Sequence, residues 1–554
     1  MRSLDKFSSL HRSEYLADMA KEELDLLIIG GGITGAGILL DAQVRGLKAA
    51  IVEMQDFAAG TSSRSTKLVH GGLRYLKQLE IKLVAEVGKE RAIVYENAPH
   101  VTTPEWMLLP LIEGGTYGRF TTSVGLKVYD YLAGVKRDER RTMLSRAQTM
   151  EKEPLLREDK LKGGGYYVEY RTDDARLTIE VMKEAVARGA KAINYVKAEN
   201  FIYDRNHHIL GSLAVDLLTG DKKMIRAKKI VNAAGPWADT LREIDGSKKG
   251  KHLRLTKGVH LVFDQSKFPL RQSIYFDTPD GRMVFAIPRD GKTYLGTTDT
   301  FYEGDITGPT VTLDDQNYLV TAANFMFPSL GLTIKDIESS WSGLRPLIHE
   351  EGKSPSELSR KDEIFISDSG LITIAGGKLT GYRKMAERVV DLVAKDLSAA
   401  GGPSYPKCTT DRIVLSGGHF GGSAEYKLFV QKKVEEGTRL GLTTQIAEKL
   451  TRRYGSNIDL LYDIYKSEQW THNNPELWLP LVYGIRHEMV ATPSDFFIRR
   501  TGALYFHIAW VHKWKETVNQ YMQSEFQWSE EQETKYRDTL DRQLHEAAHA
   551  VSLQ

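Results

Sequence analysis

The chain has 554 residues, of which 41% are hydrophobic and 27% charged, and its formal net charge is +2. This length predicts two or three domains, and a near-neutral chain with interspersed acids and bases is not expected to bind nucleic acid. A single cysteine, Cys408, excludes an intramolecular disulfide and multi-cysteine metal or iron–sulfur centres, so we expect a reducing compartment and no metal site.

The first forty residues predict neither export nor a membrane span. Residues 1–21 mix polar, apolar and charged side chains and lack the apolar core of an export signal. Residues 24–40 are more apolar, but they contain Asp25 and five glycines and are slightly shorter than the ~20 residues that cross a bilayer. The spacing of the glycines favours another role for this segment.

A strand, a glycine-rich turn and a helix are predicted next. The apolar run 24–29 leads into glycines spaced as Gly30, Gly32 and Gly35. In such a unit the first glycine allows a tight turn, the second lets a pyrophosphate approach the backbone, and the third lets helix and strand pack closely. The helix, expected from about Ile33 to Arg45, points its free N–H groups and its positive dipole end at the pyrophosphate.

A second predicted strand, 49–52, ends at Glu53, 18 residues after Gly35. A carboxylate at this position binds the ribose hydroxyls of an adenine dinucleotide and repels a 2′-phosphate. Because NAD and FAD both use this unit, the unit itself leaves the choice between them open.

The segment 60–75, GTSSRSTKLVHGGLRY, follows Glu53 closely. Its serines and threonines supply donors for phosphate and ribityl oxygens, and Gly71 and Gly72 let a flat ring approach. An NAD-binding fold would more often continue from Glu53 into an ordinary helix. The segment therefore favours a flavin, although a polar surface loop would have a similar composition.

Between about residues 77 and 401, short β-branched runs alternate with helices and turns. Runs that read as buried strands are 229–233, 260–263, 283–287, 293–296 and 371–375. The last of them runs into Gly376 and Gly377, and the segment 378–383 begins a helix. The dipole of that helix would stabilise negative charge on a reduced flavin ring.

Residues 401–406 hold two glycines and two prolines, which predicts a domain boundary near residue 402. Beyond it helical periods replace the β-branched runs, and apolar stripes can form on 440–454, 457–465 and 477–490. The final stretch, 529–550, is charged. We therefore predict an all-helical C-terminal domain at 403–554.

These motifs resemble those of the FAD-dependent glycerol-3-phosphate dehydrogenases, a family within the D-amino-acid-oxidase-like superfamily. The matching segments follow the family's order at 60–75, 170–177, 231–237, 257–260, 296–299, 342–347, 376–383 and 483–503. The resemblance extends from residue 10 to residue 528 and implies an α/β (α+β) fold. In this fold a Rossmann-like FAD-binding domain, 1–402, is interleaved with a β-sheet-rich substrate domain, mainly 78–170 and 251–350. The C-terminal all-helical domain follows.

The resemblance selects FAD as the cofactor. The residues expected to bind it are Gly30, Gly32, Ile33, Thr34, Gly35, Glu53, Thr61, Ser62, Ser63, Ser65, Lys67, Leu68, His70, Gly71, Gly72, Ala234, Gly235, Trp237, Gly376, Gly377, Lys378, Leu379 and Thr380.

The resemblance further implies oxidation of sn-glycerol 3-phosphate at C2 to dihydroxyacetone phosphate, by hydride transfer to flavin N5. His260 is the expected general base, because histidine titrates near neutrality, and His70 is the alternative. Arg345 is expected to bind the phosphate or another substrate oxygen, and Lys378 to stabilise developing negative charge. Further expected substrate-binding residues are Arg74, Tyr75, Arg360 and Thr380. Structural ion pairs and a structural strand histidine are the competing interpretations.

The chain has no second glycine motif for a nicotinamide, and the resemblance implies a membrane quinone as the electron acceptor. It also implies a cytoplasmic protein that associates peripherally with the inner face of the plasma membrane, and a homodimer is a candidate assembly. Residues 496–501 and 510–515 pair aromatic with basic side chains and could contact the membrane. Core aromatics with a solvated basic edge explain both segments equally well.

Three alternatives remain open at this stage. A glycerol-3-phosphate oxidase would share the FAD and substrate motifs but reduce O2, and we find no mid-chain insertion of the kind that marks some of these oxidases. An amine or amino-acid oxidase of the same superfamily would need a carboxylate anchor for its substrate. A flavin-stabilised binding scaffold would not turn over a substrate at all.

Overall fold

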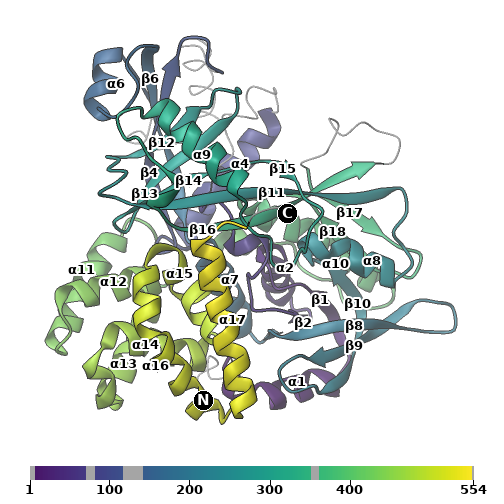
Figure 1. Cartoon of the computed structure of the whole chain (residues 1–554). Helices are drawn as coiled ribbons and strands as arrows, with labels where there is room; N and C mark the ends of the chain where they lie inside the picture. Colours follow the sequence, from purple (N-terminus) through teal and green to yellow (C-terminus); the bar gives the residue numbers. More distant parts are fainter. Residues whose placement is uncertain (1–6, 70–80, 117–140, 351–360, 552–554) are drawn as a thin grey trace.

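The computed structural model of the chain describes residues 7–69, 81–116, 141–350 and 361–551. These residues form two sheets and a group of C-terminal helices (Figure 1). The C-terminal helices, yellow-green to yellow in Figure 1, lie beside both sheets. The sheets bring together strands from distant parts of the chain.

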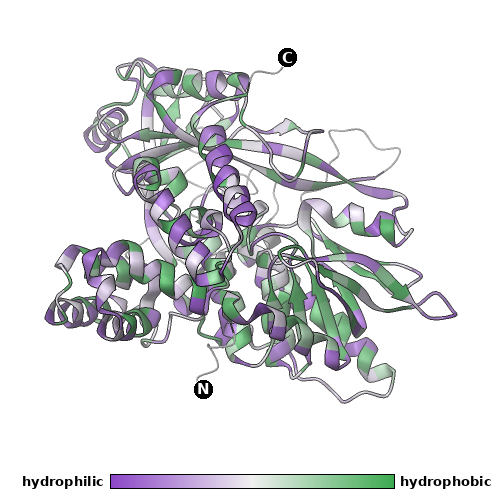
Figure 2. Cartoon of the chain, turned by 60° about the horizontal axis from the view of Figure 1, so that its bottom comes forward, coloured by the Kyte–Doolittle hydropathy of each residue, from purple (hydrophilic) through white to green (hydrophobic). Residues whose placement is uncertain are grey.

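The first sheet is mainly parallel. Its described strands run in the order β17-β18-β10-β1-β2-β7, and β9 pairs antiparallel with β10 and β8. The β1 sequence LDLLII is buried almost from end to end, as expected for a central parallel strand covered on both faces. Figure 2 shows the central strands of this sheet mostly in the green of hydrophobic residues. The strands are β1 (Leu24–Ile29), β2 (Ala49–Val52), β7 (Lys191–Ile193), β8 (Val196–Tyr203), β9 (Ile209–Asp216), β10 (Lys222–Asn232), β17 (Glu363–Ile366) and β18 (Ile372–Ala375).

Three helices pack together against this sheet. They are α2 (Ile33–Val44), α7 (Asp174–Ala187) and α10 (Tyr382–Ala399), and their apolar residues share one core with β1 and β2. Two shorter helices, α1 (Arg12–Lys21) and α8 (Ala238–Ile244), contact β10 and β18. The sheet and α2 therefore form the strand–turn–helix unit that the glycine spacing predicts.

The second sheet is mostly antiparallel, and its described strands run in the order β15-β11-β14-β13-β12-β4-β6-β3. Alternate residues of β11 face opposite sides: Val259 and Leu261 pack with α9 (Leu313–Met326), whereas His260 and Val262 face the other way. The strands are β3 (Leu68–Val69), β4 (Thr102–Ile112), β5 (Thr142–Leu144), β6 (Leu161–Thr172), β11 (Lys251–Asp264), β12 (Ser273–Asp277), β13 (Met283–Arg289), β14 (Lys292–Gly296), β15 (Thr300–Phe301) and β16 (Ile337–Glu350). The helices α4 (Ile81–Asn97) and α6 (Arg146–Lys152) flank β4 and β6.

The C-terminal part is helical. It contains α11 (Tyr426–Arg439), α12 (Thr444–Tyr454), α13 (Ile458–Ser467), α14 (Pro475–His487), the π-helical turn η12 (Asp495–Arg500), α15 (Ala503–Phe506), α16 (Ile508–Phe526) and α17 (Glu530–Ala548). The last helix returns to the second sheet, where the Ser340 hydroxyl of β16 donates to the carbonyl oxygen of Ala547 at 3.0 Å. Of the helices in the described ranges, none combines the length and the apolar composition that crossing a bilayer requires.

The segment 496–501 is part of the core. Phe496 and Phe497 are fully buried, and Arg499 and Arg500 are also buried. Contact between this segment and a membrane surface, one of the two interpretations of its sequence, is therefore wrong. The aromatic side chains pack inside the helical domain, as the other interpretation expected, but the basic residues beside them are buried against acidic partners and do not form a solvated edge.

Candidate active site

A cavity of about 980 Å³ lies where the carboxyl ends of the parallel strands meet the second sheet. Sites for small molecules and cofactors typically measure ~300–1,000 Å³, so this cavity is at the upper end and suits a large ligand. Its wall contains residues that follow β1, β2, β10 and β18 in the first sheet, and residues of β11, β13 and β16 in the second.

The glycine turn after β1 forms one side of the cavity. Gly30 has φ +115°, which side chains rarely adopt, and a Cβ there would lie 2.5 Å from the carbonyl oxygen of Ala233. Gly35 lies behind the wall, where a Cβ would overlap the carbonyl oxygen of Gly30, so its absence lets α2 pack against the turn. Ile33, the first residue of α2, lines the cavity, and its backbone N–H donates to Ser62 Oγ at 2.9 Å.

Glu53 marks the end of the cavity beyond β2. Its Oε2 accepts the N–H of Gly31 at 2.6 Å and its Oε1 accepts the N–H of Gln55 at 2.7 Å. Burial raises the pKa of the Glu53 carboxyl, and the two backbone hydrogen bonds oppose this shift. Val196 and Ala198 line the same end. Glu53 therefore lies at the end of the cavity where the sequence motif predicts the ribose. Its carboxylate also holds the backbone of Gly31 and Gln55 in place.

The polar loop after residue 60 divides into two sets of residues. Those that line the cavity are Thr61, Ser62, Arg64, Ser65, Thr66 and Leu68. Ser63 and Lys67 lie behind the wall, where Lys67 Nζ donates to the Ser63 carbonyl oxygen at 3.0 Å and to Asp174 Oδ1 at 2.7 Å. The Ser65 hydroxyl also donates to Asp174, at 2.7 Å. Ser63 and Lys67 thus hold the loop in shape, and the first residue of α7 anchors it.

Two further turns complete the wall on the first-sheet side. Ala234, Gly235 and Trp237 follow β10, and Gly376 and Gly377 follow β18. The second pair has φ +76° and +84°, and a Cβ on Gly376 would lie 2.5 Å from the carbonyl oxygen of Lys361. The next residues, Lys378, Leu379 and Thr380, line the cavity just before α10 begins. The start of α10 therefore lies at the cavity, as predicted for a helix whose dipole acts on a bound ring.

His260 places its ring at the cavity although the residue is only 1% exposed. Its Nε2 lies 2.9 Å from Thr66 Oγ1, while Nδ1 is buried and has no hydrogen-bond partner among the described residues. The ring stacks on Trp341, with centroids 4.7 Å apart. Burial, together with the positive charges of Arg345 and Lys67, lowers the pKa of His260 well below its usual 6.5. The ring is therefore neutral, and one of its two nitrogens is an acceptor.

Arg345 extends from β16 to the same cavity. Its Nη1 donates to the carbonyl oxygen of Thr298 at 3.2 Å and to Asp299 Oδ1 at 3.3 Å, and its Nη2 donates to Thr297 Oγ1 at 3.0 Å. A Cβ on Gly258 would overlap Nη2, so this glycine makes room for the guanidinium. The turn 297–299 fixes the direction of the guanidinium at the wall, where it can bind an oxyanion.

The structure brings the three expected catalytic side chains, His260, Arg345 and Lys378, to one cavity. The expected cofactor or substrate residues that also line it are Gly30, Gly32, Ile33, Thr34, Glu53, Thr61, Ser62, Ser65, Leu68, Ala234, Gly235, Trp237, Gly376, Gly377, Leu379 and Thr380. Gly35, Ser63 and Lys67 lie behind the wall. Six expected residues lie outside the described part of the chain: His70, Gly71, Gly72, Arg74, Tyr75 and Arg360.

Several lining residues were missed in the sequence. Thr66 belongs to a loop with many hydroxyls, and only its position opposite His260 distinguishes it. Tyr275 of β12 and Phe285 of β13 line the cavity with their rings stacked 4.2 Å apart. No local pattern marks these strand aromatics, because only the pairing of the strands in the second sheet brings them to the cavity.

The residues present fit an adenine dinucleotide that carries a flat ring. The glycine turn and the N–H groups of α2 form a cradle for a pyrophosphate, and the buried Glu53 lies at one end of the cavity. The Gly376 and Gly377 backbone, which leaves no space for a Cβ at Gly376, closes the wall beside the expected catalytic residues. Cofactor and substrate groups would therefore meet in one shared cavity.

Two protein families match the chain. Residues 25–383 match the family described as "FAD dependent oxidoreductase". Residues 408–533 match the family described as "C-terminal domain of alpha-glycerophosphate oxidase".

Curated relatives match over almost the whole length. The aerobic glycerol-3-phosphate dehydrogenase of Bacillus subtilis (strain 168) is 61% identical over 546 residues, which is 98% of each chain. The protein of the same name from Staphylococcus aureus (strain USA300) is 56% identical over 546 residues, again 98% of each chain.

Solved structures agree with these matches. The glycerol-3-phosphate dehydrogenase from Bacillus halodurans complexed with FAD superposes with a TM-score of 0.86, at 54% identity and over 99% of each chain. The FAD-bound L-alpha-glycerophosphate oxidase from Mycoplasma pneumoniae superposes with a TM-score of 0.54, over 67% of this chain and 95% of that one. At 18% identity, this second likeness shows the fold alone.

Proposed function

The chain belongs to the family of FAD-dependent glycerol-3-phosphate dehydrogenases, and from that premise we propose that it oxidises sn-glycerol 3-phosphate and passes the electrons to a respiratory quinone. Membership confirms the α/β fold class with its C-terminal helical domain, the assignment as an FAD-dependent enzyme, and FAD as the cofactor. The substrate, the acceptor and the roles of individual residues remain proposals.

One observation carries the proposal: the dinucleotide turn and the side chains of His260, Arg345 and Lys378 line one continuous cavity. FAD supplies the hydride acceptor when it is bound. Oxidation at C2 of glycerol 3-phosphate also requires a cation for the phosphate and an acceptor for the hydroxyl proton, and the cavity wall offers both.

Arg345 binds the phosphate or a neighbouring substrate oxygen in this proposal. Its guanidinium direction is preset by Thr297, Thr298 and Asp299, so little side-chain freedom is lost when an oxyanion binds. Lys378, at the turn before α10, stabilises negative charge that develops during the reaction.

His260 accepts the proton of the C2 hydroxyl at Nε2. The geometry supports this atom, because Nδ1 is buried and Nε2 lies beside the cavity-lining hydroxyl of Thr66. The lowered pKa keeps the ring neutral before the reaction, and Thr66 can donate to, accept from, or pass a proton on to Nε2.

Anaerobic addition of glycerol 3-phosphate to the oxidised protein tests the reaction directly. We expect the absorbance of the bound flavin to bleach, and unphosphorylated glycerol at the same concentration to leave it unchanged. No bleaching by glycerol 3-phosphate while FAD is retained would reject the proposed substrate. His260→Ala and Arg345→Ala, both with FAD occupancy checked, should bleach far more slowly, and near-normal rates in both would reject their roles.

The quinone is the finer part of the proposal. It is supported by the relatives' name, aerobic glycerol-3-phosphate dehydrogenase, and by a sequence without a second glycine motif for a nicotinamide. The alternative is an oxidase that reduces O2. Peroxide yield should be measured beside the reduction of a soluble quinone analogue at the same substrate concentration. Peroxide formation in proportion to substrate, without quinone reduction, would favour the oxidase.

We further propose a cytoplasmic enzyme that binds the inner face of the plasma membrane, where a quinone is accessible. The segment 510–515, with partly exposed aromatics and lysines, supports this. Cosedimentation with anionic liposomes at low and high salt tests the proposal, and complete recovery in the supernatant at both salt concentrations would reject it. The proposed homodimer is tested by the molar mass in solution.

A further inference from the structure

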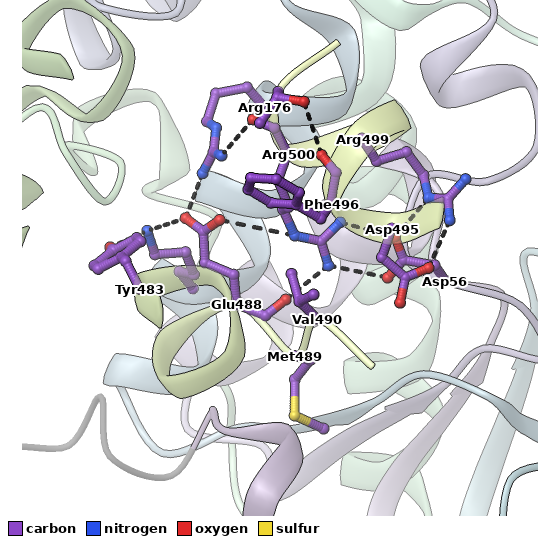
Figure 3. Close-up of polar contacts among 12 residues, drawn as sticks. Asp56, Arg176, Tyr483, Glu488, Met489, Val490, Asp495, Phe496, Arg499 and Arg500 are labelled. Atoms are coloured by element: carbon purple, nitrogen blue, oxygen red, sulfur yellow. Dashed lines mark hydrogen bonds and ion pairs between the residues drawn. The ribbon is translucent and has the colours of Figure 1, made fainter. Parts of the chain in front are cut away.

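A cluster of buried charges joins the C-terminal helices to the first sheet (Figure 3). We call it the interdomain charge cluster. Its acids are Asp56, Glu180, Glu488 and Asp495, and its bases are Arg176, Lys183, Arg499 and Arg500. None of these side chains is more than 7% exposed. Each charge has therefore lost its water and depends on its partners.

Asp56, in the turn after β2 of the first sheet, is one of two carboxylates on which the cluster centres. Arg500 donates to both of its carboxylate oxygens, at 2.8 Å and 3.0 Å, and Arg499 Nε donates to Oδ2 at 2.5 Å. Asn194 adds a fourth bond, from Nδ2 to Oδ1 at 2.9 Å. Two consecutive arginines of η12 thus fix one carboxylate in a two-pronged geometry that permits little movement.

Glu488, in the C-terminal part, is the other of these two residues. Its carboxylate forms ion pairs with Arg176 and Lys183, both from α7. The distance from Lys183 Nζ to Glu488 Oε1 is 3.0 Å. Arg500 Nη2 donates to the backbone carbonyl oxygen of Glu488 at 2.7 Å, so one arginine joins both residues. Figure 3 shows Arg500 between Asp56 and Glu488.

The turn held by Asp56 shapes the cofactor cavity. Glu53 and Gln55, which precede Asp56 closely in the chain, line the cavity. The N–H of Tyr195 donates to the carbonyl oxygen of Gln55 at 2.9 Å, and the Tyr195 hydroxyl donates to Asp495 at 2.6 Å. Both the turn after β2 and the residue before β8 are therefore tied to η12.

Through α7, the cluster also supports the polar loop around Ser65. Arg176 and Lys183 lie on α7, whose first residue, Asp174, holds Ser65 and Lys67 of that loop. Arg176 Nη2 also donates to the carbonyl oxygen of Arg500, at 3.2 Å. The same buried charges thus connect two separate parts of the cofactor cavity to the C-terminal helices.

A buried ion cluster often stabilises a fold less than apolar residues of the same volume would, because the cost of removing charges from water can exceed their mutual attraction. What hydrogen-bonded charges do well is fix geometry. Here the fixed geometry is that of the turn 53–56 and of the loop around Ser65. The position of Asp56, one residue after the cavity-lining Gln55, points to a role in binding the cofactor.

We propose that the interdomain charge cluster is a positioning device through which the C-terminal helices hold the turn 53–56 in the conformation that binds FAD. The retention of FAD then depends on residues that do not line the cavity. The proposal concerns the cofactor and holds for whichever substrate or electron acceptor the enzyme uses.

The experiment measures FAD release from the purified holoenzyme, followed by the rise in fluorescence of the freed flavin. Asp56→Asn keeps the shape of the side chain but removes its charge. We expect this variant to release FAD about tenfold faster, by analogy with the ~10–100-fold loss of metal affinity when a residue that supports a metal ligand is removed. Turnover per bound FAD should stay unchanged, because no group at the reacting end of the cavity is altered.

Asp41→Asn is the matched control. Asp41 and Arg45 form a buried pair on α2 at 2.7 Å, with side chains 0% and 2% exposed, and neither residue lines the cavity. This variant should lower the melting temperature without accelerating FAD release. The comparison separates general destabilisation from loss of positioning.

Arg500→Lys is the milder second variant. It keeps the positive charge but loses the two-pronged bond to Asp56, so FAD release should accelerate less than in Asp56→Asn. If Asp56→Asn does not fold, Arg500→Lys and Arg499→Lys carry the test with the same measurements. FAD release at the wild-type rate in folded variants, with only a lower melting temperature, would overturn the proposal.

Discussion

The Nε2 atom of His260 lies 2.9 Å from the hydroxyl oxygen of Thr66, and both side chains line the cavity. The other ring nitrogen is buried without a described partner, so proton exchange with a ligand must pass through Nε2 or through the threonine hydroxyl. In the proposed mechanism the histidine and the threonine therefore act as one proton-handling unit, assembled from β11 and from the polar loop after residue 60.

Thr66→Val should lower kcat by about tenfold, while His260→Asn should lower it by about 10²–10⁴-fold, the usual range for loss of a general base. The threonine variant loses only the hydroxyl that orients or relays the proton, whereas the histidine variant loses the acceptor itself. Thr66→Ser, which keeps the hydroxyl, should behave like the wild type. Wild-type kcat in Thr66→Val, at equal FAD content, would show that the hydroxyl plays no part.

Gly258→Ala should impair substrate binding although the residue contributes no functional group. An added Cβ would overlap Nη2 of Arg345 and push the guanidinium from its position beside Thr297. We expect KM for glycerol 3-phosphate to rise by about tenfold, as it should in Arg345→Lys, which loses the planar two-pronged contact. Gly308→Ala is the control, since a Cβ there would meet only Asp305 Oδ2, at 4.0 Å, an ordinary van der Waals contact. An unchanged KM in Gly258→Ala would contradict the assigned role of Arg345.

Glu53→Gln should weaken FAD binding by about tenfold, because an amide cannot accept from both the Gly31 and the Gln55 N–H groups. One carboxylate oxygen becomes an NH2 donor that faces another donor, and the turn must shift. FAD titration of the protein, followed by flavin fluorescence, measures the effect. Equal affinities for Glu53→Gln and the wild type would show that the carboxylate is dispensable for the turn and for the ribose.

Asp56→Asn should lower the melting temperature at neutral pH, and this loss should shrink in acid. Burial alone would raise the pKa of Asp56, but Arg500 and Arg499 lower it from 3.8 to about 2. A carboxyl with a lowered folded-state pKa contributes stability that is fully present above its unfolded pKa and is lost as the pH falls through the folded value.

The melting temperatures of wild type and Asp56→Asn should therefore differ most above about pH 5, approach each other as the pH falls from about 5 to about 2, and converge below about pH 2, where protonated aspartic acid resembles asparagine. Thermal unfolding at a series of pH values measures the difference. A difference that stays constant over this range would mean that the charge of Asp56 does not contribute.

The dinucleotide unit illustrates what sequence can predict. The expected strand 24–29, helix from 33 and strand 49–52 are observed as β1, α2 and β2 with almost the same bounds. The apolar run, the glycines without Cβ atoms and the helix dipole act within a few residues of one another, so the local sequence contains all the necessary information.

Helix ends in the C-terminal part were harder to predict. The stripe 477–490 extends three residues past the end of α14 at His487, because Glu488 leaves the helix to meet Arg176 and Lys183 of α7. The charged stretch 529–550 contains the helix α17, which begins at a capping box formed by Ser529 and Gln532. Tertiary partners and caps, which an apolar stripe does not reveal, decide where these helices start and stop.

The residues of the candidate site could be predicted only in part, because tertiary contacts also decide which residues meet there. Motif residues such as His260 and Arg345 were found, but their partners Thr66 and Gly258 were not singled out, although they lie in the matching segments 60–75 and 257–260. Sheet pairing places these residues together. Ser63 and Lys67 belong to a motif and yet support the loop from behind, because each loop residue can face only one side.

By itself, the sequence determined the dinucleotide turn, the FAD family and the helical character of the C-terminal part, since these follow from local backbone constraints and from recognisable motifs. Only the tertiary structure decided that Arg500 binds Asp56, which lies 444 residues earlier in the sequence and follows Glu53 in the same turn. A buried charge selects its partner through burial and geometry, and neither exists until the chain has packed.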